Sequence, residues 1–181
     1  LKQKTTQHFF SATQGRFPPG STFKVVTATS GIERGGVTRD NPSYPVSSSY
    51  QPPGGGRPIP NFGGSSCGGT LFPILQDSCN TAFAQMGVDT GGANLQEIAQ
   101  GFGFDREVPI DLPGAVQSTF PAAVVNDPPT LAQASIGQNE VQATPLQMAM
   151  VAAGVANDGE IMTPHVTREI RDDQGNLVEE L

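Results

Sequence analysis

Glycine and proline interrupt this chain so often that they limit the length of every element it can form. The 22 glycines and 16 prolines together make up about a fifth of the 181 residues, which is above average usage. They are dense between residues 37 and 67, which include the run NPSYPVSSSYQPPGGGRPIPNFGGSSC, with no stretch suited to a helix. We therefore expect a long loop with short strands there. A loop of this length is uncommon unless it carries function or lines a site.

Elsewhere the sequence predicts several short helices. Apolar residues at intervals of three and four predict the first over residues 22–32, after a turn at Pro18, Pro19 and Gly20 and before stops at Gly31, Gly35 and Gly36. The other helices are expected over residues 70–76, about 81–86 with a stop at Gly87, 94–101 with a stop at Gly101, and 144–158 with Thr144 as N-cap and Pro145 at the first helical position. Residues 165–181 alternate around a DDQGN turn and predict a β-hairpin. The pattern is α+β with a mainly helical body.

Charge and hydropathy exclude several classes of protein. The net charge is -7 and no basic stripe is present, so nucleic acid is not an expected partner. No apolar run approaches the roughly 20 residues of a membrane-spanning helix, and the first residues lack a signal-peptide pattern. The only histidines, His8 and His165, do not complete a zinc set with Cys67 and Cys79, so we expect no metal. The two cysteines could form one disulfide, which would suit an extracytoplasmic compartment, or remain reduced thiols.

The segment RFPPGSTFKVVTATSG places Ser21 three residues before Lys24 at the expected start of the first helix. Residues three apart on a helix share a face, so a hydroxyl and an amine would lie side by side. A lysine with a lowered pKa can deprotonate a serine, and the N–H groups of a helix start can stabilise an oxyanion. The alternative is a serine N-cap followed by a solvated lysine.

A second candidate lies in the break between two expected helices, at Asp77 to Asn80. In the sequence Ser78-Cys79-Asn80, alternate side chains can point into one cleft while the middle one points away. A hydroxyl and an amide are suited to relaying a proton and to holding a substrate amide. The alternative is that Ser78 or Asn80 simply caps the second helix.

Taken together, these segments resemble the transpeptidase domain of penicillin-binding proteins, the serine acyltransferases that cross-link bacterial peptidoglycan. PPGSTFK is similar to the nucleophile segment of the class B members, SCN stands at the S-x-N position, and ASIGQNEVQATPLQMAMVAAGVANDGEIMTPHV looks like the stretch before a third motif. The resemblance covers about Ala12 to at least Val166 and is nearest to the actinobacterial penicillin-binding protein A group. It implies the α+β fold that these transpeptidases share with serine β-lactamases, here mainly the helical subdomain with part of the flanking sheet.

The resemblance also implies roles for individual residues. Ser21 is the expected acylated nucleophile and Lys24 its general base. Ser78 would pass a proton to the leaving amine with Lys24 as its other partner, and Asn80 would hold the side-chain amide of the substrate or β-lactam.

Other positions would have structural parts in the same resemblance. Gly137 and Gln138 of SIGQ are expected to be structural. Cys79 would point out of the cleft, and a bridge to Cys67 would pin the preceding loop.

The third family motif, K-[ST]-G, does not occur after Val166, because no lysine follows Lys24. The family uses that strand for carboxylate recognition and for half of the oxyanion hole. The sequence Lys4-Thr5-Thr6 lies upstream and has threonine where glycine is needed, so we treat residues 1–15 as a lead-in. We expect residues 16–181 to be a partial penicillin-binding transpeptidase domain, lacking a membrane anchor and exposing the apolar face that the family buries against its sheet.

The implied function is a peptidoglycan D,D-transpeptidase that forms an acyl-enzyme with D-Ala-D-Ala stem peptides and is acylated by β-lactams. The alternative is a non-catalytic β-lactam sensor or degenerate homologue. A serine β-lactamase is disfavoured because no ExxLN segment is present to position a hydrolytic water. The resemblance implies no cofactor. Expected partners are stem peptides, β-lactams and proteins of cell division or elongation, at an extracytoplasmic location with the full-length protein anchored in the membrane.

Overall fold

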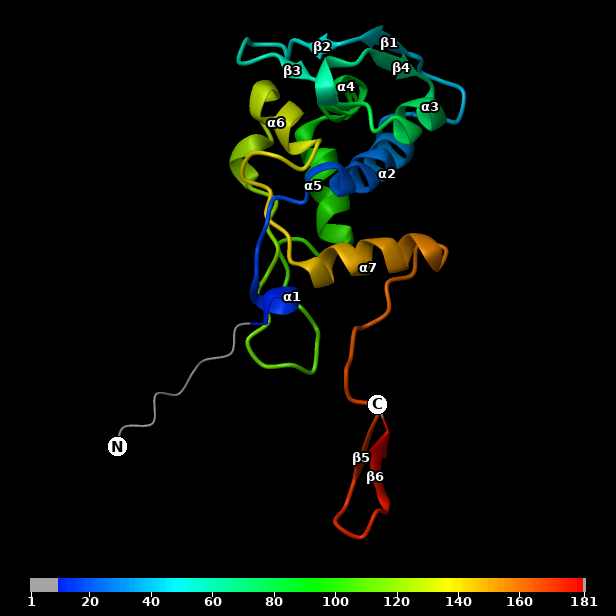
Figure 1. The fold of residues 1–181 in the computed structure, drawn as a ribbon, viewed down its shortest axis with the longest axis vertical. Helices are drawn as coiled ribbons and strands as arrows, with labels where there is room; N and C mark the ends of the chain where they lie inside the picture. Colours follow the sequence, from blue (N-terminus) through cyan, green and yellow to red (C-terminus); the bar gives the residue numbers. More distant parts are fainter. Residues whose placement is uncertain (1–9, 181) are drawn as a thin grey trace, which may run out of the picture.

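The computed structural model describes residues 10–180 (Figure 1). Its helical body is built around helix α2 (Lys24–Arg34). It packs against α4 (Asn80–Thr90) and α5 (Gly92–Gly101), and α4 packs in turn against α6 (Pro128–Ala134). The face that α2 turns inward includes Val26, Thr27 and Ser30, all fully buried. The α+β fold with a mainly helical body is confirmed.

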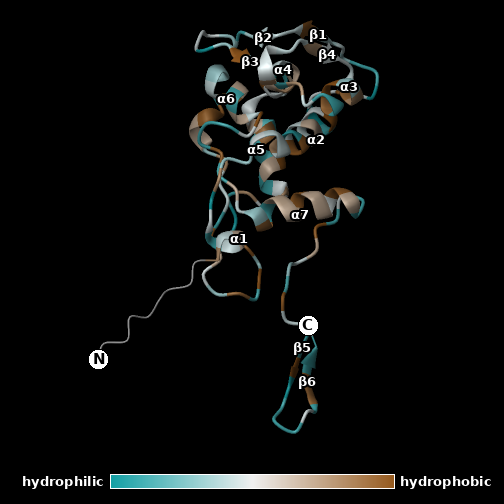
Figure 2. Cartoon of the chain, viewed as in Figure 1, coloured by the Kyte–Doolittle hydropathy of each residue, from teal (hydrophilic) through white to brown (hydrophobic). Residues whose placement is uncertain are grey.

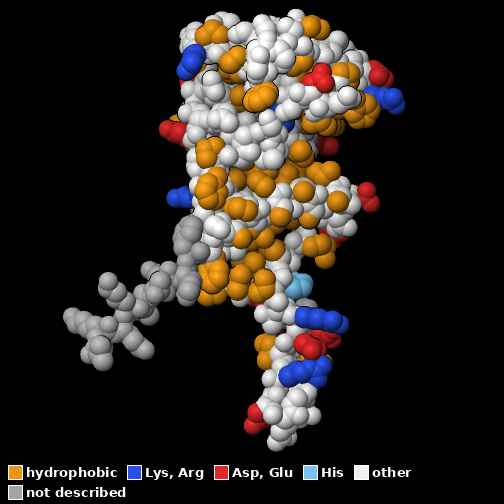
Figure 3. All heavy atoms as spheres, in the orientation of Figure 1, with side chains coloured by type: hydrophobic (Ala, Val, Ile, Leu, Met, Phe, Trp, Pro, Cys, Tyr) orange, Lys and Arg blue, Asp and Glu red, His pale blue; other side chains and the backbone are white. Residues whose placement is uncertain are grey.

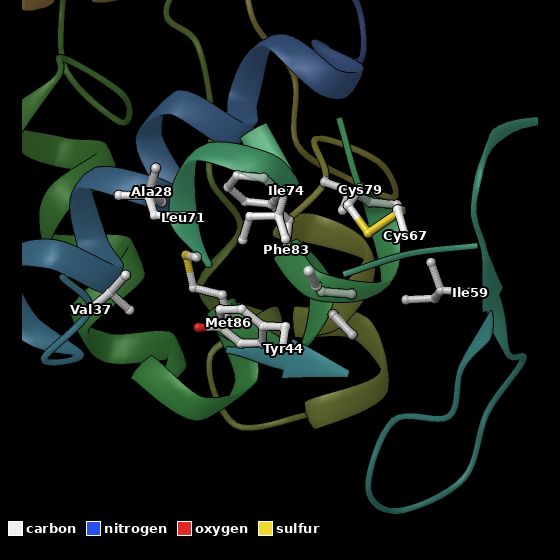
Figure 4. Close-up of a cluster of buried hydrophobic side chains, with 14 residues drawn as sticks. Ala28, Val37, Tyr44, Ile59, Cys67, Leu71, Ile74, Cys79, Phe83 and Met86 are labelled. Atoms are coloured by element: carbon white, nitrogen blue, oxygen red, sulfur yellow. A yellow bond between two sulfur atoms is a disulfide. The ribbon is translucent and has the colours of Figure 1, made fainter. Parts of the chain in front are cut away.

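Two hydrophobic clusters lie among these helices. The first surrounds α4 and contains Tyr44, Ile74, Phe83 and Met86, together with the disulfide that joins Cys67 to Cys79 (Figure 4). The second is centred on Phe23, whose ring lies 5.4 Å from that of Phe104 and 5.8 Å from that of Phe120. Because Phe23 immediately precedes Lys24, the second cluster anchors the start of α2.

The segment between α2 and α3 (Leu71–Gln76) is the predicted loop with short strands. Strand β1 (Tyr44–Ser47) pairs antiparallel with β4 (Cys67–Gly69), and β2 (Ser49–Tyr50) pairs antiparallel with β3 (Ile59–Pro60). The 3-10 turn η2 (Phe62–Gly64) follows β3. These pairs cover one end of the body beside α4 (Figure 1).

Helix α7 (Pro145–Ala156) begins as predicted, with the Thr144 hydroxyl accepting a hydrogen bond from the Gln147 N–H at 3.1 Å. Hydrophobic residues dominate α7 (Figure 2), and hydrophobic side chains gather over this part of the surface (Figure 3). One apolar hollow there is lined by residues at the start of α2 and along α7, among them Val25, Met148, Val151 and Val155. The structure thus exposes an apolar face along α2 and α7.

The C-terminal hairpin pairs β5 (Glu169–Arg171) with β6 (Leu177–Glu180) and projects from the helical body (Figure 1). The backbone N–H groups of Val166 and Thr167 donate to the Asp111 carboxylate at 2.8 and 2.7 Å. Hydrogen bonds from the Thr167 side chain and from both backbone groups hold the pKa of Asp111 at about 2. The hairpin prediction is confirmed.

Several predicted boundaries are wrong for a common reason. Gly87 lies inside α4, where a β-carbon would come within 1.8 Å of the Ser135 hydroxyl, so this glycine permits close packing and does not stop the helix. Gly31 likewise lies inside α2, against the Met86 sulfur. Sequence periodicity carries no signal for such a contact between distant helices.

Other elements were not predicted at all. They are α1 (Ser11–Gln14), which lies within the expected lead-in, the 3-10 turn η3 (Ala122–Val124), and α6. The first helix was predicted to begin at residue 22, but that position belongs to the 3-10 turn η1 (Gly20–Phe23), and α2 itself begins at Lys24. The prediction for Lys4, Thr5 and Thr6 lies outside the described residues.

Candidate active site

The nucleophile candidate lies on a 3-10 turn that precedes the α-helix. Ser21 belongs to η1 and Lys24 is the first residue of α2, so the two side chains face each other across this junction. Gly20 has a φ of 57°, a left-handed conformation that favours glycine, and its N–H donates to the Gly137 carbonyl at 2.9 Å. The turn is therefore held from outside by the segment that contains Gly137.

The second candidate segment forms the turn between α3 and α4. Ser78 has a φ of 52°, which is uncommon for a residue other than glycine and marks a strained position. Cys79 is the N-cap of α4 and Asn80 its first residue. This geometry directs Ser78 and Asn80 toward Lys24, while the sulfur of Cys79 bonds to Cys67 on β4.

Lys24 joins the two segments. Its side chain is 1% exposed, and its Nζ lies 3.2 Å from Ser21 Oγ and 2.9 Å from Ser78 Oγ. It also lies 2.6 Å from the Ser78 carbonyl oxygen and 2.6 Å from Asn80 Oδ1. The structure thus brings all four predicted site residues together around one amine.

Burial lowers the pKa of Lys24 from 10.5 to about 8, because removing the ammonium from water destabilises its charge. A neutral amine has two N–H donors and one lone pair. The Ser78 carbonyl and Asn80 Oδ1 can only accept, so they match the two donors. The lone pair is then free to accept a proton from a hydroxyl, either that of Ser21 or that of Ser78.

These groups open onto a cleft of about 530 Å³. Both polar and apolar side chains line it. They come from η1, from the turn before α4, from β3 and η2, and from α6 and the residues after that helix. The lining residues are Ser21, Ile59, Pro60, Phe62, Asp77, Ser78, Asn80, Gln133, Ile136 and Gln138.

Asn61 supports this cleft from behind. Its buried side-chain amide donates to the Ser47 carbonyl at 2.7 Å and to the Ser65 carbonyl at 3.0 Å. Its Oδ1 accepts from the Thr81 N–H at 3.0 Å, in the first turn of α4. The loop that carries Pro60 and Phe62 is therefore attached to the helix that carries Asn80.

Sequence reasoning missed part of this site. Gln138, predicted to be structural, lines the cleft, whereas Gly137 packs so closely on Gly20 that a β-carbon would lie 2.2 Å from the Gly20 carbonyl oxygen. Phe62 and Asn61 had no individual signal beyond their place in a long loop, which was itself expected to line a site. Among residues 10–180, no group of three or more His, Cys, Asp or Glu side chains is arranged to hold a metal ion.

Comparison with known proteins bears directly on this geometry. The family model for the penicillin binding protein transpeptidase domain matches residues 2–180. The chain belongs to the penicillin-binding protein transpeptidase family. Within it, the chain is 39% identical over 162 residues to the peptidoglycan D,D-transpeptidase PbpA of Mycolicibacterium smegmatis, covering 86% of this chain and 32% of that protein. It is also 29% identical over 154 residues to the stage V sporulation protein D of Bacillus subtilis, covering 84% of this chain and 23% of that one.

Solved structures of the family agree in fold. The chain superimposes on penicillin-binding protein A of Mycobacterium tuberculosis, solved as a ceftriaxone acyl-enzyme complex, with a TM-score of 0.87 and 32% identity, covering 94% of this chain and 38% of that one. The D,D-transpeptidase domain of a peptidoglycan glycosyltransferase from Eggerthella lenta gives a TM-score of 0.86 at 29% identity, covering 94% of this chain and 44% of that one. The chain spans about a third of the length of its mycobacterial PbpA relatives. Among the described residues, no helix combines the length and the apolar character needed to cross a membrane.

Proposed function

We propose that this chain carries the acyl-transfer machinery of a peptidoglycan D,D-transpeptidase, with Ser21 as nucleophile, Lys24 as general base, Ser78 as proton relay and Asn80 as the group that holds the substrate amide. The observation that carries the proposal is the position of Lys24 Nζ within hydrogen-bonding distance of both hydroxyls and of Asn80 Oδ1. The lowered pKa of Lys24 supports the same assignment, because a base must be neutral to accept a proton.

The first half of the reaction forms the acyl-enzyme. Ser21 Oγ bonds to the carbonyl carbon of the penultimate D-Ala while its proton moves to Lys24 Nζ. The tetrahedral adduct then loses the terminal D-Ala by cleavage of the C–N bond. The leaving nitrogen takes a proton from Ser78 Oγ, which regains one from Lys24 Nζ, so the lysine is neutral again and the serine carries an ester.

The second half transfers the acyl group. A neighbouring stem-peptide amine attacks the ester, its proton leaves along the same route in reverse, and Ser21 is restored. A β-lactam would acylate Ser21 by the first half alone, with its amide nitrogen remaining attached to the product after the ring opens. The hydroxyl of Ser78 lies 2.9 Å from Lys24 Nζ, within reach for both proton transfers.

The test is intact-mass spectrometry of the 181-residue chain after incubation with benzylpenicillin, followed by peptide mapping. We expect a single adduct on Ser21. The Ser21→Ala variant should fold with little change in stability and take no adduct. Labelling that survives this substitution, or a folded chain that takes no adduct, would overturn the assignment.

A second function is a β-lactam sensor without turnover, which would use the same acylation of Ser21 beside Lys24. The two functions differ in one product. Release of D-Ala from a stem-peptide mimic indicates the transpeptidase, whereas a long-lived adduct without D-Ala release indicates the sensor.

Membership of the family supports a proposal for location and partners. We propose that residues 16–181 are part of a larger transpeptidase domain, with residues 1–15 as its lead-in. The protein would act outside the cytoplasmic membrane, anchored to it, with the machinery of cell division or elongation. The Cys67–Cys79 disulfide supports this location, because disulfides persist in oxidising compartments.

A further inference from the structure

Asp77 is the only charged residue among those that line the cleft within residues 10–180. Its side chain is exposed, and it immediately precedes Ser78, which lines the same cleft. The ion pairs within this part of the chain use other carboxylates. The cleft therefore presents a carboxylate that no cation of the described residues neutralises.

The fold itself gains little from a carboxylate at this position. Asp77 is the C-cap of α3, and the C-terminal end of a helix carries partial negative charge, which disfavours an acidic side chain. Because the side chain is exposed, it also adds nothing to the hydrophobic clusters. A residue that breaks a local rule without a structural gain is expected at a functional site. The charge thus indicates a partner that is not part of the fold.

The backbone that carries this carboxylate is held on both sides. The Asp77 N–H donates to the Pro73 carbonyl at 3.0 Å. The Cys79 N–H donates to the Ile74 carbonyl at 2.9 Å, and the Cys79 sulfur bonds to Cys67. The carboxylate therefore extends from a turn whose position is set before any ligand arrives.

The place of Asp77 next to Ser78 indicates which ligand group it meets. In the proposed reaction, Ser78 gives a proton to the leaving nitrogen and takes one from the incoming nitrogen, so both nitrogens pass close to its hydroxyl. The incoming group is a stem-peptide amine, which is an ammonium at neutral pH because alkyl amines have a pKa of about 10. A nearby carboxylate attracts that ammonium, and a neutral Lys24 does not repel it.

We propose that Asp77 is a specificity-determining residue for the acceptor, whose carboxylate binds the ammonium form of the attacking stem-peptide amine and so favours cationic over uncharged acceptors. The inference rests on the proposed function, since it takes Ser21 as the acylated residue and Ser78 as the proton relay. It concerns the second substrate, which enters after the acyl-enzyme has formed.

The acceptor loses two protons during the transfer. The bound ammonium first releases one to solvent water. The neutral nitrogen then bonds to the ester carbon, while its second proton passes to Ser78 Oγ and the Ser78 proton passes to Lys24 Nζ. The C–O bond to Ser21 breaks, and Lys24 returns its proton to Ser21 Oγ. Asp77 stays ionised throughout, so it acts on the binding of the acceptor and not on bond formation.

The test measures how the acyl-enzyme divides between water and two added nucleophiles. The donor is N-benzoyl-D-alanyl thioglycolate, a thioester that acylates Ser21 in the proposed function. The nucleophiles are Nα-acetyl-lysinamide, which is an ammonium at pH 7.5, and hydroxylamine, which is uncharged at that pH. Chromatography of the products, corrected for the reaction without protein, gives the concentration of each nucleophile that diverts half of the acyl group from water.

Three variants complete the comparison. Asp77→Asn removes the charge and keeps the shape of the side chain. Asp77→Glu keeps the charge. Asp40→Asn is the matched control, because Asp40 is an exposed acidic residue outside the cleft.

We expect Asp77→Asn to raise the half-diverting concentration of the lysine amine about 2- to 5-fold, as for loss of an exposed ion pair, with no change for hydroxylamine. Asp77→Glu and Asp40→Asn should retain the values of the original chain. Equal effects on both nucleophiles, no effect on either, or no transfer to either overturns the inference, while benzylpenicillin adducts on Ser21 uphold the proposed function. A folded original chain that takes no benzylpenicillin adduct overturns the proposed function and this inference with it.

Discussion

The amine of Lys24 contacts all three of the other proposed site residues. Four oxygens surround its Nζ, and two of them, the Ser78 carbonyl and Asn80 Oδ1, can only accept hydrogen bonds. The environment therefore satisfies the neutral amine and leaves its lone pair directed at a hydroxyl. Burial lowers the pKa to about 8, which keeps a useful fraction neutral near physiological pH.

This arrangement predicts how acylation depends on pH. Below about 8 most Lys24 is protonated and cannot accept the Ser21 proton, so the acylation rate should rise about tenfold per pH unit and level off above pH 8. The measurement is the rate of benzylpenicillin acylation between pH 5.5 and 9.5, with circular dichroism to confirm folding at each pH.

Lys24→Arg provides the control for this profile. A guanidinium stays protonated throughout this range, so the variant should take no adduct at any pH. A flat profile for the original chain would exclude Lys24 as the base, and a rate that still rises tenfold per pH unit at pH 9.5 would show that its pKa is not lowered.

At the scale of elements, the start of α2 depends on a contact that the helix itself does not make. Gly137 has a φ of 68°, and a β-carbon there would lie 2.2 Å from the Gly20 carbonyl oxygen and 2.8 Å from the Phe23 β-carbon. The residues after α6 and the turn that carries Ser21 therefore fit together only with glycine at this position.

We expect Gly137→Ala to destabilise the chain by more than about 3 kcal/mol, or to prevent folding, since backbone strain and a steric clash add together. Gly36→Ala is the matched control, because Gly36 has a φ of 67° but nothing within 4 Å of an added β-carbon. That variant bears only the backbone strain, of about 1–2 kcal/mol. Urea unfolding of both variants is the measurement, and equal losses of stability would show that the contact with Gly20 is unimportant.

Helix boundaries were predicted correctly where the local sequence determines them, and incorrectly where contacts between distant helices determine them. The start of α7 follows from Thr144 and Pro145, whose capping chemistry is local. The interiors of α2 and α4 contain Gly31 and Gly87, which look like stops until the neighbouring helix is placed against them. Helix α6 begins with two prolines after the capping Asp127, a start signal hidden in an irregular proline-rich stretch.

For the molecule as a whole, sequence indicated the proposed reacting groups better than the surface around them. Ser21, Lys24, Ser78 and Asn80 were predicted because their segments resemble the motifs of one family and their residue types suit its chemistry. Their meeting depends on α2 packing against α4, which brings together residues more than fifty positions apart. The cleft wall had no comparable signal, because a phenylalanine in a glycine-rich loop has no local pattern that says which way it faces.

The last prediction concerns how that wall stays attached to the helices. Cys67 and Cys79 close a loop with a sequence separation of 12, which joins the strand-containing segment to the start of α4. Cross-linking a loop of this size stabilises a chain by about 3 kcal/mol, chiefly by restricting the unfolded state. Reduction should therefore lower the melting temperature and preferentially loosen residues 44–66, whereas α7 packs elsewhere and should keep its protection.

Amide hydrogen exchange with and without reductant measures this difference, and Cys67→Ser, which removes the bond, should exchange like the reduced chain under both conditions. The lysine and both serines would still meet through α2 and α4, so acylation by benzylpenicillin should persist. Protection of residues 44–66 that does not change on reduction would show that Asn61 and the strand pairs hold the wall without the disulfide.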